Sequence, residues 1–379
     1  MMEEASVSVR LNPFKTPSSP LPILESSVKV PWCDYGYILK ERPVFTLHPL
    51  FHAGCYYVQD SSAMYVGYVF RKSLASFQGR KGLKVLDLCA APGGKTTDLA
   101  ASLREACGDD FALVSNEVMK RRASILYDNV KRWGDPNVLV TSADPAAFAK
   151  AGGYFDIMVA DVPCSGEGMF RKDERAREEW SPDIVDLCAA RQKRILADAW
   201  PALKEGGILV YSTCTYEKAE NDDNLEWAAE ELGGEIISPG NEFAGYGVQL
   251  TAHGNLLKVG NVPGEGQWVG AIRKTSKATQ ATKSFPIRAF RQEEDGFDVD
   301  EALSIKFDRN RYHCIEVDKQ TALKFLHRDA LVLKEAEPGY NVLTYRDIPL
   351  GFVKNTGTRC NNLLPKARRI LMNIEAVLK

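Results

Sequence analysis

Over the middle of the chain, short apolar runs alternate with longer segments in which apolar residues recur every three or four positions. The short runs are typical of buried β-strands, and the longer segments are typical of amphipathic helices. Strands that alternate with helices in this way predict an α/β fold, a doubly wound and mostly parallel sheet with helices on both faces. The predicted strands cover residues 84–90, 112–117, 137–144, 155–161 and 207–214, with a last edge strand at 267–273, and helices are predicted from 96, at 121–133, at 184–203 and up to 232.

The alternation is confined to one part of the chain, which indicates more than one domain. The first 80 residues hold a strand-like alternation at 6–12 and an aromatic-rich segment that leads into a helix from Ser61. After residue 275, a Ser/Thr/Lys-rich linker precedes a β-leaning region and a basic helix that we expect from Leu364. The three expected parts are an N-terminal accessory region (1–80), a central α/β domain (81–275) and a small C-terminal domain (285–379).

The composition is that of a soluble globular protein, with 45% hydrophobic and 26% charged residues. No apolar run reaches the roughly 18 residues of a membrane span, and the N-terminus lacks a signal-peptide pattern, so we expect a cytoplasmic location. The nine cysteines include no close-spaced pair, so neither a metal site nor a disulfide framework is indicated. Residues 271–379 contain 20 Lys and Arg against 14 Asp and Glu, which is compatible with a polyanionic partner and equally with a solvated surface.

Chemically active side chains follow two predicted strands at their carboxyl ends. Asp161 ends one strand and Cys164 comes shortly after it, while Cys214 ends the next strand along the chain. Ligands of open α/β sheets bind outside these strand ends. A lone cysteine there is usually structural, but both of these stand in polar contexts in which a thiol can be activated as a nucleophile. We therefore predict an acid and two thiols at one site.

A glycine turn after the first central strand predicts a nucleoside site. The pattern is neither a P-loop, because position 89 is Cys, nor a dinucleotide fingerprint. Glu117 ends the second strand, where an acid commonly binds ribose hydroxyls, and Asp144 ends the third, where it can meet an adenine amino group. Each acid alone is more often a helix cap, but with Asp161 they form three acids beside the turn. The turn consists of Cys89, Ala90, Ala91, Pro92, Gly93, Gly94 and Lys95.

Three motifs together resemble those of the Sun/Nop-type RNA 5-methylcytosine methyltransferases, and in particular the bacterial RsmF-like branch. These motifs are Asp87-Leu-Cys-Ala-Ala-Pro-Gly-Gly-Lys-Thr-Thr97, Asp161-Val-Pro-Cys-Ser-Gly-Glu-Gly168 with Arg171-Lys-Asp173 after it, and Tyr211-Ser-Thr-Cys-Thr215 with Glu220-Asn221 after it. Trp180-Ser-Pro182 and Tyr57–Ser62 also look like family positions, and the tail 349–366 is similar to the PUA-like RNA-binding module of that branch. Relatives usually carry a helical segment before the first strand, so the resemblance implies an abbreviated N-terminal RNA-binding region.

The resemblance implies a class I, Rossmann-like methyltransferase domain that binds S-adenosyl-L-methionine. Residues Cys89 to Lys95 would hold the methionine end of this cofactor, Glu117 the ribose and Asp144 the adenine, with Asp161 between cofactor and target base. The sequence itself leaves open which cysteine attacks the base. Similar RNA enzymes imply that Cys214 attacks carbon 6 of cytosine and Cys164 assists release. The basic residues expected to contact RNA are Lys354, Arg359, Lys366, Arg368 and Arg369.

We therefore expect a monomeric RNA cytosine-5 methyltransferase, with 16S ribosomal RNA as the substrate by analogy with this branch. A tRNA target is the nearest alternative. Two alternatives from other classes are a nucleotide-hydrolysing protein, for which the first glycine of a P-loop is missing, and a non-catalytic RNA-binding scaffold, which the two cysteines and Asp161 disfavour.

Overall fold

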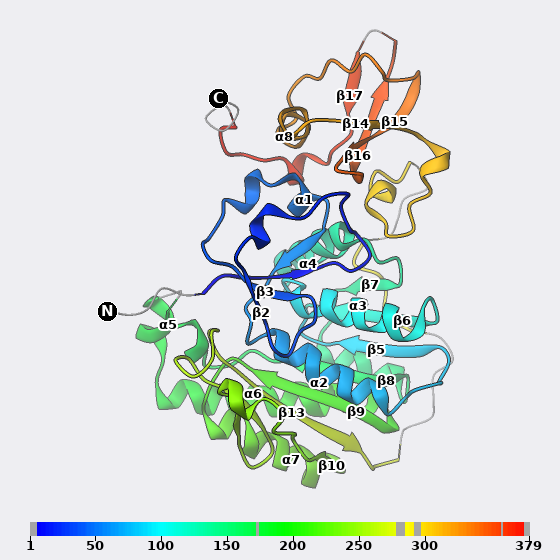
Figure 1. Ribbon diagram of the computed structural model, residues 1–379. Coiled ribbons are helices and arrows are strands. Elements are labelled where there is room, and N and C mark those ends of the chain that lie inside the picture. Colours follow the sequence, from blue (N-terminus) through cyan, green and yellow to red (C-terminus); the bar gives the residue numbers. More distant parts are fainter. Residues whose placement is uncertain (1–5, 172–173, 278–284, 292–296, 358, 375–379) are drawn as a thin grey trace.

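A nine-stranded mixed sheet forms the centre of the computed structural model, which describes residues 6–171, 174–277, 285–291, 297–357 and 359–374 (Figure 1). The strand order is β11-β12-β13-β9-β8-β5-β6-β7, and β10 pairs with β13. Strands β5 to β9 run parallel to one another, as predicted, and the remaining four strands are antiparallel to their neighbours. The strands are β5 (Leu83–Asp87), β6 (Phe111–Asn116), β7 (Val138–Thr141), β8 (Phe155–Asp161), β9 (Leu203–Thr213), β10 (Gly234–Ile237), β11 (Gln249–Leu250), β12 (Gly254–Leu257) and β13 (Gln267–Lys274).

Helices cover both faces of this sheet, and each packs against it through apolar residues that recur at helical spacing. In α4, the residues Ala123, Leu126, Val130 and Trp133 recur at helical spacing and are buried. Helix α6 begins where Ser181 Oγ accepts a hydrogen bond from the backbone N–H of Ile184, an N-terminal cap that the sequence places directly before Pro182. Helices α2 (Met64–Ala75), α3 (Gly94–Cys107) and α4 (Lys120–Trp133) lie on one face, α6 (Pro182–Ala199) and α7 (Asp222–Leu232) lie on the other, and the short α5 spans Glu174–Glu179.

The direction of strand addition reverses at β5. From β5 the chain adds β6 and β7 on one side and then returns to add β8 and β9 on the other. In open α/β sheets such a switch point leaves a crevice at the carboxyl ends of the two central strands. The glycine turn after β5 and Asp161 at the end of β8 therefore face the same crevice.

The last strand of the central domain does not lie at the edge of the sheet, as we had predicted for 267–273. β13 pairs with β9 on one side and with β10 and β12 on the other. Its apolar residues are buried on both faces, since Trp268, Val269 and Ile272 are each at most 1% exposed. An uninterrupted apolar run of this kind is typical of an interior strand, and the two short strands that protect it carry too little pattern to be recognised in the sequence.

The N-terminal region and the C-terminal domain each contain a four-stranded sheet, and the two share a hydrophobic core. Val9, Leu50 and Tyr56 from the N-terminal region belong to the same buried cluster as Phe325 and Leu350 from the C-terminal domain. The two regions therefore stabilise one another through this shared core, and they lie next to each other in Figure 1. The N-terminal elements are β1 (Ser8–Leu11), β2 (Val28–Lys29), β3 (Gly36–Ile38), α1 (Pro49–His52) and β4 (Tyr56–Val58), and the C-terminal elements are β14 (His313–Glu316), α8 (Lys319–His327), β15 (Gly339–Tyr345), β16 (Ile348–Asn355) and β17 (Cys360–Asn362).

The basic helix predicted from Leu364 is absent from the described residues, which extend to 374. Only a single 3-10 turn, Lys366–Arg368, forms there. Leu364, Ile370 and Ile374 are buried at irregular spacing in the core shared with the N-terminal region, and the backbone N–H of Ile370 donates to Leu326 O. Burial of these three side chains in an otherwise extended tail outweighs the local preference for a helix.

Two histidines in the N-terminal region predict an acid-sensitive junction. Burial, together with Lys319 and Arg346 from the C-terminal domain, lowers the pKa of His48 to about 4, and burial lowers the pKa of His52 to about 4 as well. Because the unfolded histidines titrate near 6.5, stability should be lost as the pH falls from 6.5 towards 4, by about 2 kcal/mol per histidine at pH 5. We expect the urea midpoint to fall between pH 7 and pH 5, and to fall much less in the double variant His48→Gln/His52→Gln. A His253→Gln control, in the central domain, should behave like wild type, and equal losses in all three proteins would contradict the prediction.

None of the described helices is both long and apolar enough to cross a membrane. Within the same residues, no group of three or more His, Cys, Asp or Glu side chains is arranged to hold a metal ion.

Candidate active site

The two predicted cysteines lie side by side at the carboxyl ends of β8 and β9. These strands are parallel neighbours in which Asp161 pairs with Ser212, and the backbone N–H of Val162 donates to Ser212 O over 3.1 Å. Cys214 directly follows β9 and Cys164 lies three residues after the end of β8, and their Sγ atoms are 3.1 Å apart. The predicted proximity of the two thiols is therefore confirmed.

Hydrogen bonds between the loops fix the position of Cys214. The backbone N–H of Gly168 donates to Cys214 O over 2.8 Å, and a Cβ at Gly168 would lie 2.8 Å from the same oxygen, so only glycine fits there. Glu167 Oε2 accepts hydrogen bonds from Thr215 Oγ1 (2.9 Å) and from the backbone N–H of Tyr216 (2.7 Å). The loop after β8 thus holds the loop after β9 and keeps Cys214 beside Cys164.

Asp161 is the centre of a set of hydrogen-bond donors. Lys95 Nζ lies 2.7 Å from Asp161 Oδ2, while Ser212 Oγ (2.8 Å) and Gln267 Nε2 (2.9 Å) donate to Oδ1. Burial opposes the charge on Lys95, but the neighbouring Asp161 outweighs this and raises the pKa of the lysine above its ordinary value. Lys95, which the sequence assigned to the cofactor turn, therefore points its ammonium group at the predicted catalytic acid.

The charged groups around the two thiols differ. The hydrogen bond from Cys164 lowers the pKa of Cys214, opposed by burial and Asp161 and assisted by the cation of Lys95. The pKa of Cys164 is raised well above its ordinary value by its hydrogen bond to Cys214, by burial and by the carboxylate of Glu220. These neighbours favour ionisation of Cys214 over ionisation of Cys164.

The glycine turn shapes the amino end of α3. Gly93 has a φ of 112°, a left-handed conformation that glycine adopts without strain, and helix α3 begins at the next residue. The first backbone N–H groups of a helix are unpaired within it and attract anions. Beneath the turn, Asp87 is fully buried and accepts a hydrogen bond from Thr96 Oγ1 (2.6 Å), but its Oδ1 atom has no partner among the described residues. Burial raises the pKa of Asp87 to about 7.

The two other predicted acids occupy different environments. Glu117 is buried, accepts a hydrogen bond from the backbone N–H of Met119 (2.9 Å) and pairs with Arg122 (3.1 Å). Asp144 is exposed, and its side chain accepts from the backbone N–H of Ala146, so it also serves as the cap of the following 3-10 turn. Both lie at the ends of β6 and β7, on the same edge of the sheet as the glycine turn, and their contact with a cofactor remains a prediction.

Several residues around the site were not recognised in the sequence. Gln267 begins β13, and only the antiparallel pairing of Trp268 with Thr213 brings it to Asp161. Val118 and Met119 directly follow Glu117 and are 54% and 57% exposed, which leaves an apolar surface beside the predicted ribose ligand. The sequence signal for this surface was the pair of apolar residues directly after an acid at a predicted strand end.

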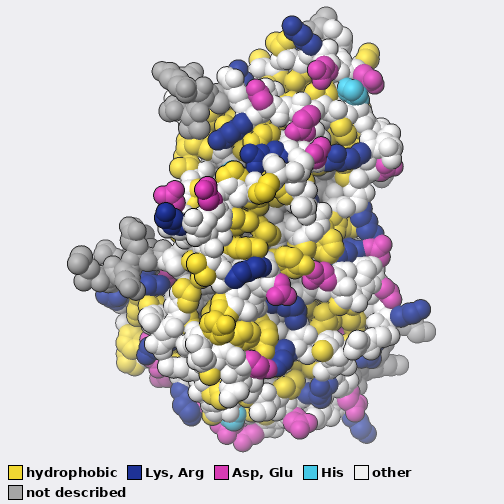
Figure 2. Space-filling view, viewed as in Figure 1, with side chains coloured by type: hydrophobic (Ala, Val, Ile, Leu, Met, Phe, Trp, Pro, Cys, Tyr) yellow, Lys and Arg dark blue, Asp and Glu magenta, His cyan; other side chains and the backbone are white. Residues whose placement is uncertain are grey.

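The basic residues predicted for RNA binding fall into two groups. Arg359, Lys366 and Arg369 are exposed, and Lys354 is half-buried with its ammonium 4.7 Å above the ring of Tyr340. Arg368 does not fit the prediction, because its guanidinium is only 12% exposed and binds Asp300 and Asp128. It links the C-terminal domain to α4. On the face seen in Figure 2, basic and acidic side chains are interspersed over the C-terminal domain at the top.

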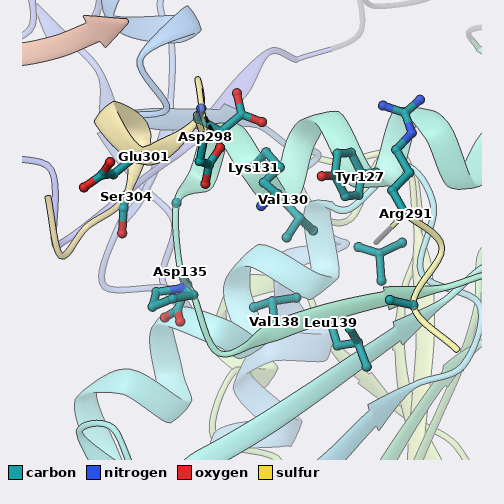
Figure 3. A pocket seen from close by; sticks show the side chains of 15 residues that line it. Tyr127, Val130, Lys131, Asp135, Val138, Leu139, Arg291, Asp298, Glu301 and Ser304 are labelled. Atoms are coloured by element: carbon teal, nitrogen blue, oxygen red, sulfur yellow. Dashed lines mark hydrogen bonds between the residues drawn. The ribbon is translucent and has the colours of Figure 1, made fainter. Parts of the chain in front are cut away.

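A cavity of about 350 Å³ lies apart from these strand ends, between α4, β7 and the segments 289–291 and 298–304 (Figure 3). Tyr127, Asp135 and Arg291 are among its lining residues, and none of the predicted site residues is. It is therefore separate from the proposed chemistry. Two parts of the sequence prediction lie outside the described residues, namely Lys172 and Asp173 of the second motif and most of the linker at 276–284.

Comparison with known families accounts for most of the chain. The model for 16S rRNA methyltransferase RsmB/F matches residues 76–233, the model for the N-terminal domain of 16S rRNA methyltransferase RsmF matches 1–61, and the model for the methyltransferase RsmF PUA domain matches 312–370. All three models describe parts of RsmB/F methyltransferases, and they match the chain in the order of its three parts. Its α/β core with a C-terminal PUA domain is the architecture that the sequence predicted.

Individual members of the RsmB/F family show the same relationship. The chain is 34% identical over 283 residues to ribosomal RNA small subunit methyltransferase F of Escherichia coli O157:H7, an alignment that covers 71% of this chain and 57% of the relative. It is 36% identical to the protein of the same name from Klebsiella pneumoniae, over 65% of this chain and 52% of the relative. The chain thus spans just over half the length of these curated relatives.

Solved structures agree with the fold of the RsmB/F family. A methyltransferase homologue from Pyrococcus horikoshii superposes with a TM-score of 0.58 and 26% identity, over 72% of this chain and 87% of that one. NSun6 from Pyrococcus horikoshii superposes with a TM-score of 0.56 and 17% identity, over 72% of this chain and 92% of that one, and shows the fold alone.

Proposed function

We propose that the protein is an S-adenosylmethionine-dependent RNA cytosine-5 methyltransferase that acts on small-subunit ribosomal RNA through a covalent bond between Cys214 and the target base. The observation that carries the proposal is the pair of sulfur atoms 3.1 Å apart, beside an Asp161 that is itself held by a lysine. The match to the RsmB/F model and the names of the relatives from Escherichia coli and Klebsiella pneumoniae support ribosomal RNA as the substrate.

The residues at the strand ends fit the chemical groups of S-adenosylmethionine. The amino end of α3 offers N–H groups for a carboxylate, while Glu117 and the unpartnered Oδ1 of Asp87 are acceptors for ammonium or hydroxyl groups. The apolar side chains of Val118 and Met119 suit the face of an adenine ring. Asp144 would accept from its amino group. When bound, the cofactor supplies a methyl group on a positively charged sulfur atom.

The side chains of the site then divide the reaction between them. Cytosine carbon 5 is a poor nucleophile, so the Cys214 thiolate first forms a bond to carbon 6, which breaks the C5–C6 double bond and makes carbon 5 electron-rich. Attack on carbon 6 builds negative charge towards N3, so a proton must be taken up there. The Asp161 carboxylate, held by Lys95, would accept a hydrogen bond from the protonated N3 or from the exocyclic amine and thereby stabilise the ring. Carbon 5 takes the methyl group. Breakage of the bond from carbon 6 to Cys214 then restores the ring. Cys164, whose sulfur lies 3.1 Å from that of Cys214, would give its proton to the departing sulfur and take up the proton lost from carbon 5.

RNA must present an unpaired or flipped base, since a base inside a duplex cannot reach a thiol at the bottom of a crevice. Lys354, Arg359, Lys366 and Arg369 would hold the phosphate backbone, with a contribution that decreases as salt increases. Arg368 is left out of this set, because its guanidinium is already paired with two acids.

Methyl transfer from radiolabelled S-adenosylmethionine to bacterial RNA tests the proposal. We expect label in 16S ribosomal RNA, or in isolated small subunits, recovered as 5-methylcytidine after digestion to nucleosides. Purified tRNA serves as the competing substrate. Label in tRNA alone would assign the reaction to a different RNA, and no label in any RNA, with cofactor binding intact by calorimetry, would contradict the proposed activity.

A further inference from the structure

A buried hydrogen-bond network lies beneath the loop that carries Cys164. Gln192 Nε2 donates to Pro163 O (2.9 Å) and to Glu220 Oε2 (2.6 Å), and the same carboxylate accepts from the backbone N–H of Ser165 (3.1 Å). The backbone is therefore hydrogen-bonded to this network at Pro163 and at Ser165, the residues on either side of Cys164. Glu220 and Gln192 are both 0% exposed.

The network joins α6, which carries Gln192, to β9 and α7 of the central domain. Tyr211 of β9 donates from its hydroxyl to the backbone O of Glu220 (2.6 Å) and also lies 3.1 Å from Gln192 Oε1. Asn224 of α7 donates to the same Gln192 Oε1 over 2.7 Å. Tyr211 and Asn224 are 0% exposed as well, so no water competes with these bonds. The groups that hold the Cys164 loop are all paired, while Asn224 Oδ1, at the far side of the network, has no partner among the described residues.

A buried carboxylate beside a thiol costs free energy of folding. Burial raises the pKa of Glu220, and the charge of Glu220 in turn disfavours a thiolate at Cys164. The other groups that act on the sulfur pair are Lys95 and Asp161, and both face Cys214. The carboxylate of Glu220 and the ammonium of Lys95 therefore bias the two sulfurs in opposite directions.

We propose that Glu220 and Gln192 are positioning residues that clamp the Cys164 loop, keep that sulfur protonated, and thereby make Cys214 the attacking sulfur. The inference rests on the proposed function for its catalytic meaning, but the clamp itself can be tested without RNA.

The first experiment measures iodoacetamide alkylation of each cysteine as a function of pH, with the modified peptides separated by mass spectrometry. In Glu220→Gln, which removes the charge at nearly constant shape, we expect alkylation of Cys164 at pH 8 to become about tenfold faster, the effect of a one-unit fall in its pKa. Glu230→Gln makes the same change on the exposed face of α7 and should leave the rates as in wild type. Equal Cys164 profiles in Glu220→Gln and Glu230→Gln would overturn the proposal.

The second experiment locates the covalent bond to RNA that contains 5-fluorocytosine. Wild type should be trapped at Cys214 only, whereas Glu220→Gln should show part of the adduct at Cys164. An adduct that stays wholly at Cys214 in a folded Glu220→Gln protein would overturn the selection role. Absence of any adduct in wild type would instead count against the proposed function, and the alkylation profiles would still decide on the clamp.

A third measurement covers the case in which Glu220→Gln does not fold. Hydrogen exchange of the wild-type peptide 162–168 should be slow, because Ser165 N–H is bound to a buried carboxylate. Gln192→Met, which removes the bond to Pro163 at similar volume, should accelerate this exchange at least about tenfold if the lost bond contributed some 1.4 kcal/mol. Rapid exchange in wild type would overturn the clamp directly.

Discussion

Replacement of Cys214 by alanine should reduce methyl transfer by on the order of 10⁴-fold to 10⁶-fold, the range observed when an enzyme loses its covalent nucleophile. The reason is the charge distribution of the sulfur pair. The hydrogen bond from Cys164 and the cation of Lys95 favour the thiolate at Cys214, and no other described thiol lies in that position. The variant should also fail to form a covalent complex with RNA that contains 5-fluorocytosine, as judged on a denaturing gel.

The variant Cys164→Ala should instead accumulate the covalent complex, which completes this test. Its nucleophile is intact, so the bond to carbon 6 should form, but release should be slow and an adduct with ordinary RNA should accumulate. Cys360→Ala, in the C-terminal domain, is the control and should resemble wild type in both assays. Trapping that survives in Cys214→Ala and disappears in Cys164→Ala would exchange the roles of the two cysteines.

The parallel sheet and the placement of the active side chains could be predicted from the sequence, because both depend on local periodicity. An apolar run that ends in a polar residue fixes the carboxyl end of a strand, and strands of a parallel sheet all end on the same edge. Asp161 and Cys214 could therefore be placed together although they are 53 positions apart in the sequence, and the pairing of Asp161 with Ser212 confirms that placement.

Contacts that depend on register or on long-range packing could not be predicted in the same way. Gln267 reaches Asp161 only because β13 turns back antiparallel to β9, and nothing near Gln267 in the sequence reports that pairing. Arg368 looks like an RNA-binding residue in a basic tail, but Asp300 and Asp128, distant in sequence, take up its charge. The tail itself is extended because it buries Ile370 and Ile374 against the N-terminal region, which no helix propensity could indicate.

The hydrogen-bond network around Cys164 also depends on long-range packing and could not be predicted from the sequence. Glu220 belongs to a recognisable motif, yet its partner Gln192 lies on α6 in a segment with no distinctive pattern. The sequence could therefore identify two thiols but could not assign them different chemistry. The asymmetry between them arises from groups that the fold brings together, namely Lys95 on one side and Glu220 on the other.

The variant Asp161→Asn should separate two properties that normally change together, the ionisation of Cys214 and the rate of methyl transfer. The charge of Asp161 raises the pKa of Cys214, so its removal should lower that pKa and make the thiol more reactive towards iodoacetamide at neutral pH. Methyl transfer should nevertheless fall by about 10²-fold to 10³-fold, the cost of losing one group that stabilises developing charge in a transition state.

The hydrogen bonds of Asp161 explain why an amide cannot replace the carboxylate. Ser212 and Gln267 both donate to Oδ1, so the oxygen of asparagine would be held there and its NH₂ group would face Lys95, which is also a donor. Lys95 would lose the partner that raises its pKa, and the target base would lose its acceptor. Asp186→Asn, on the exposed side of α6, is the matched control. Faster alkylation of Cys214 together with slower methyl transfer is the expected pair of results. A shift of Cys214 alkylation to higher pH would show that the carboxylate supports the thiolate, and unchanged methyl transfer would remove Asp161 from the chemistry altogether.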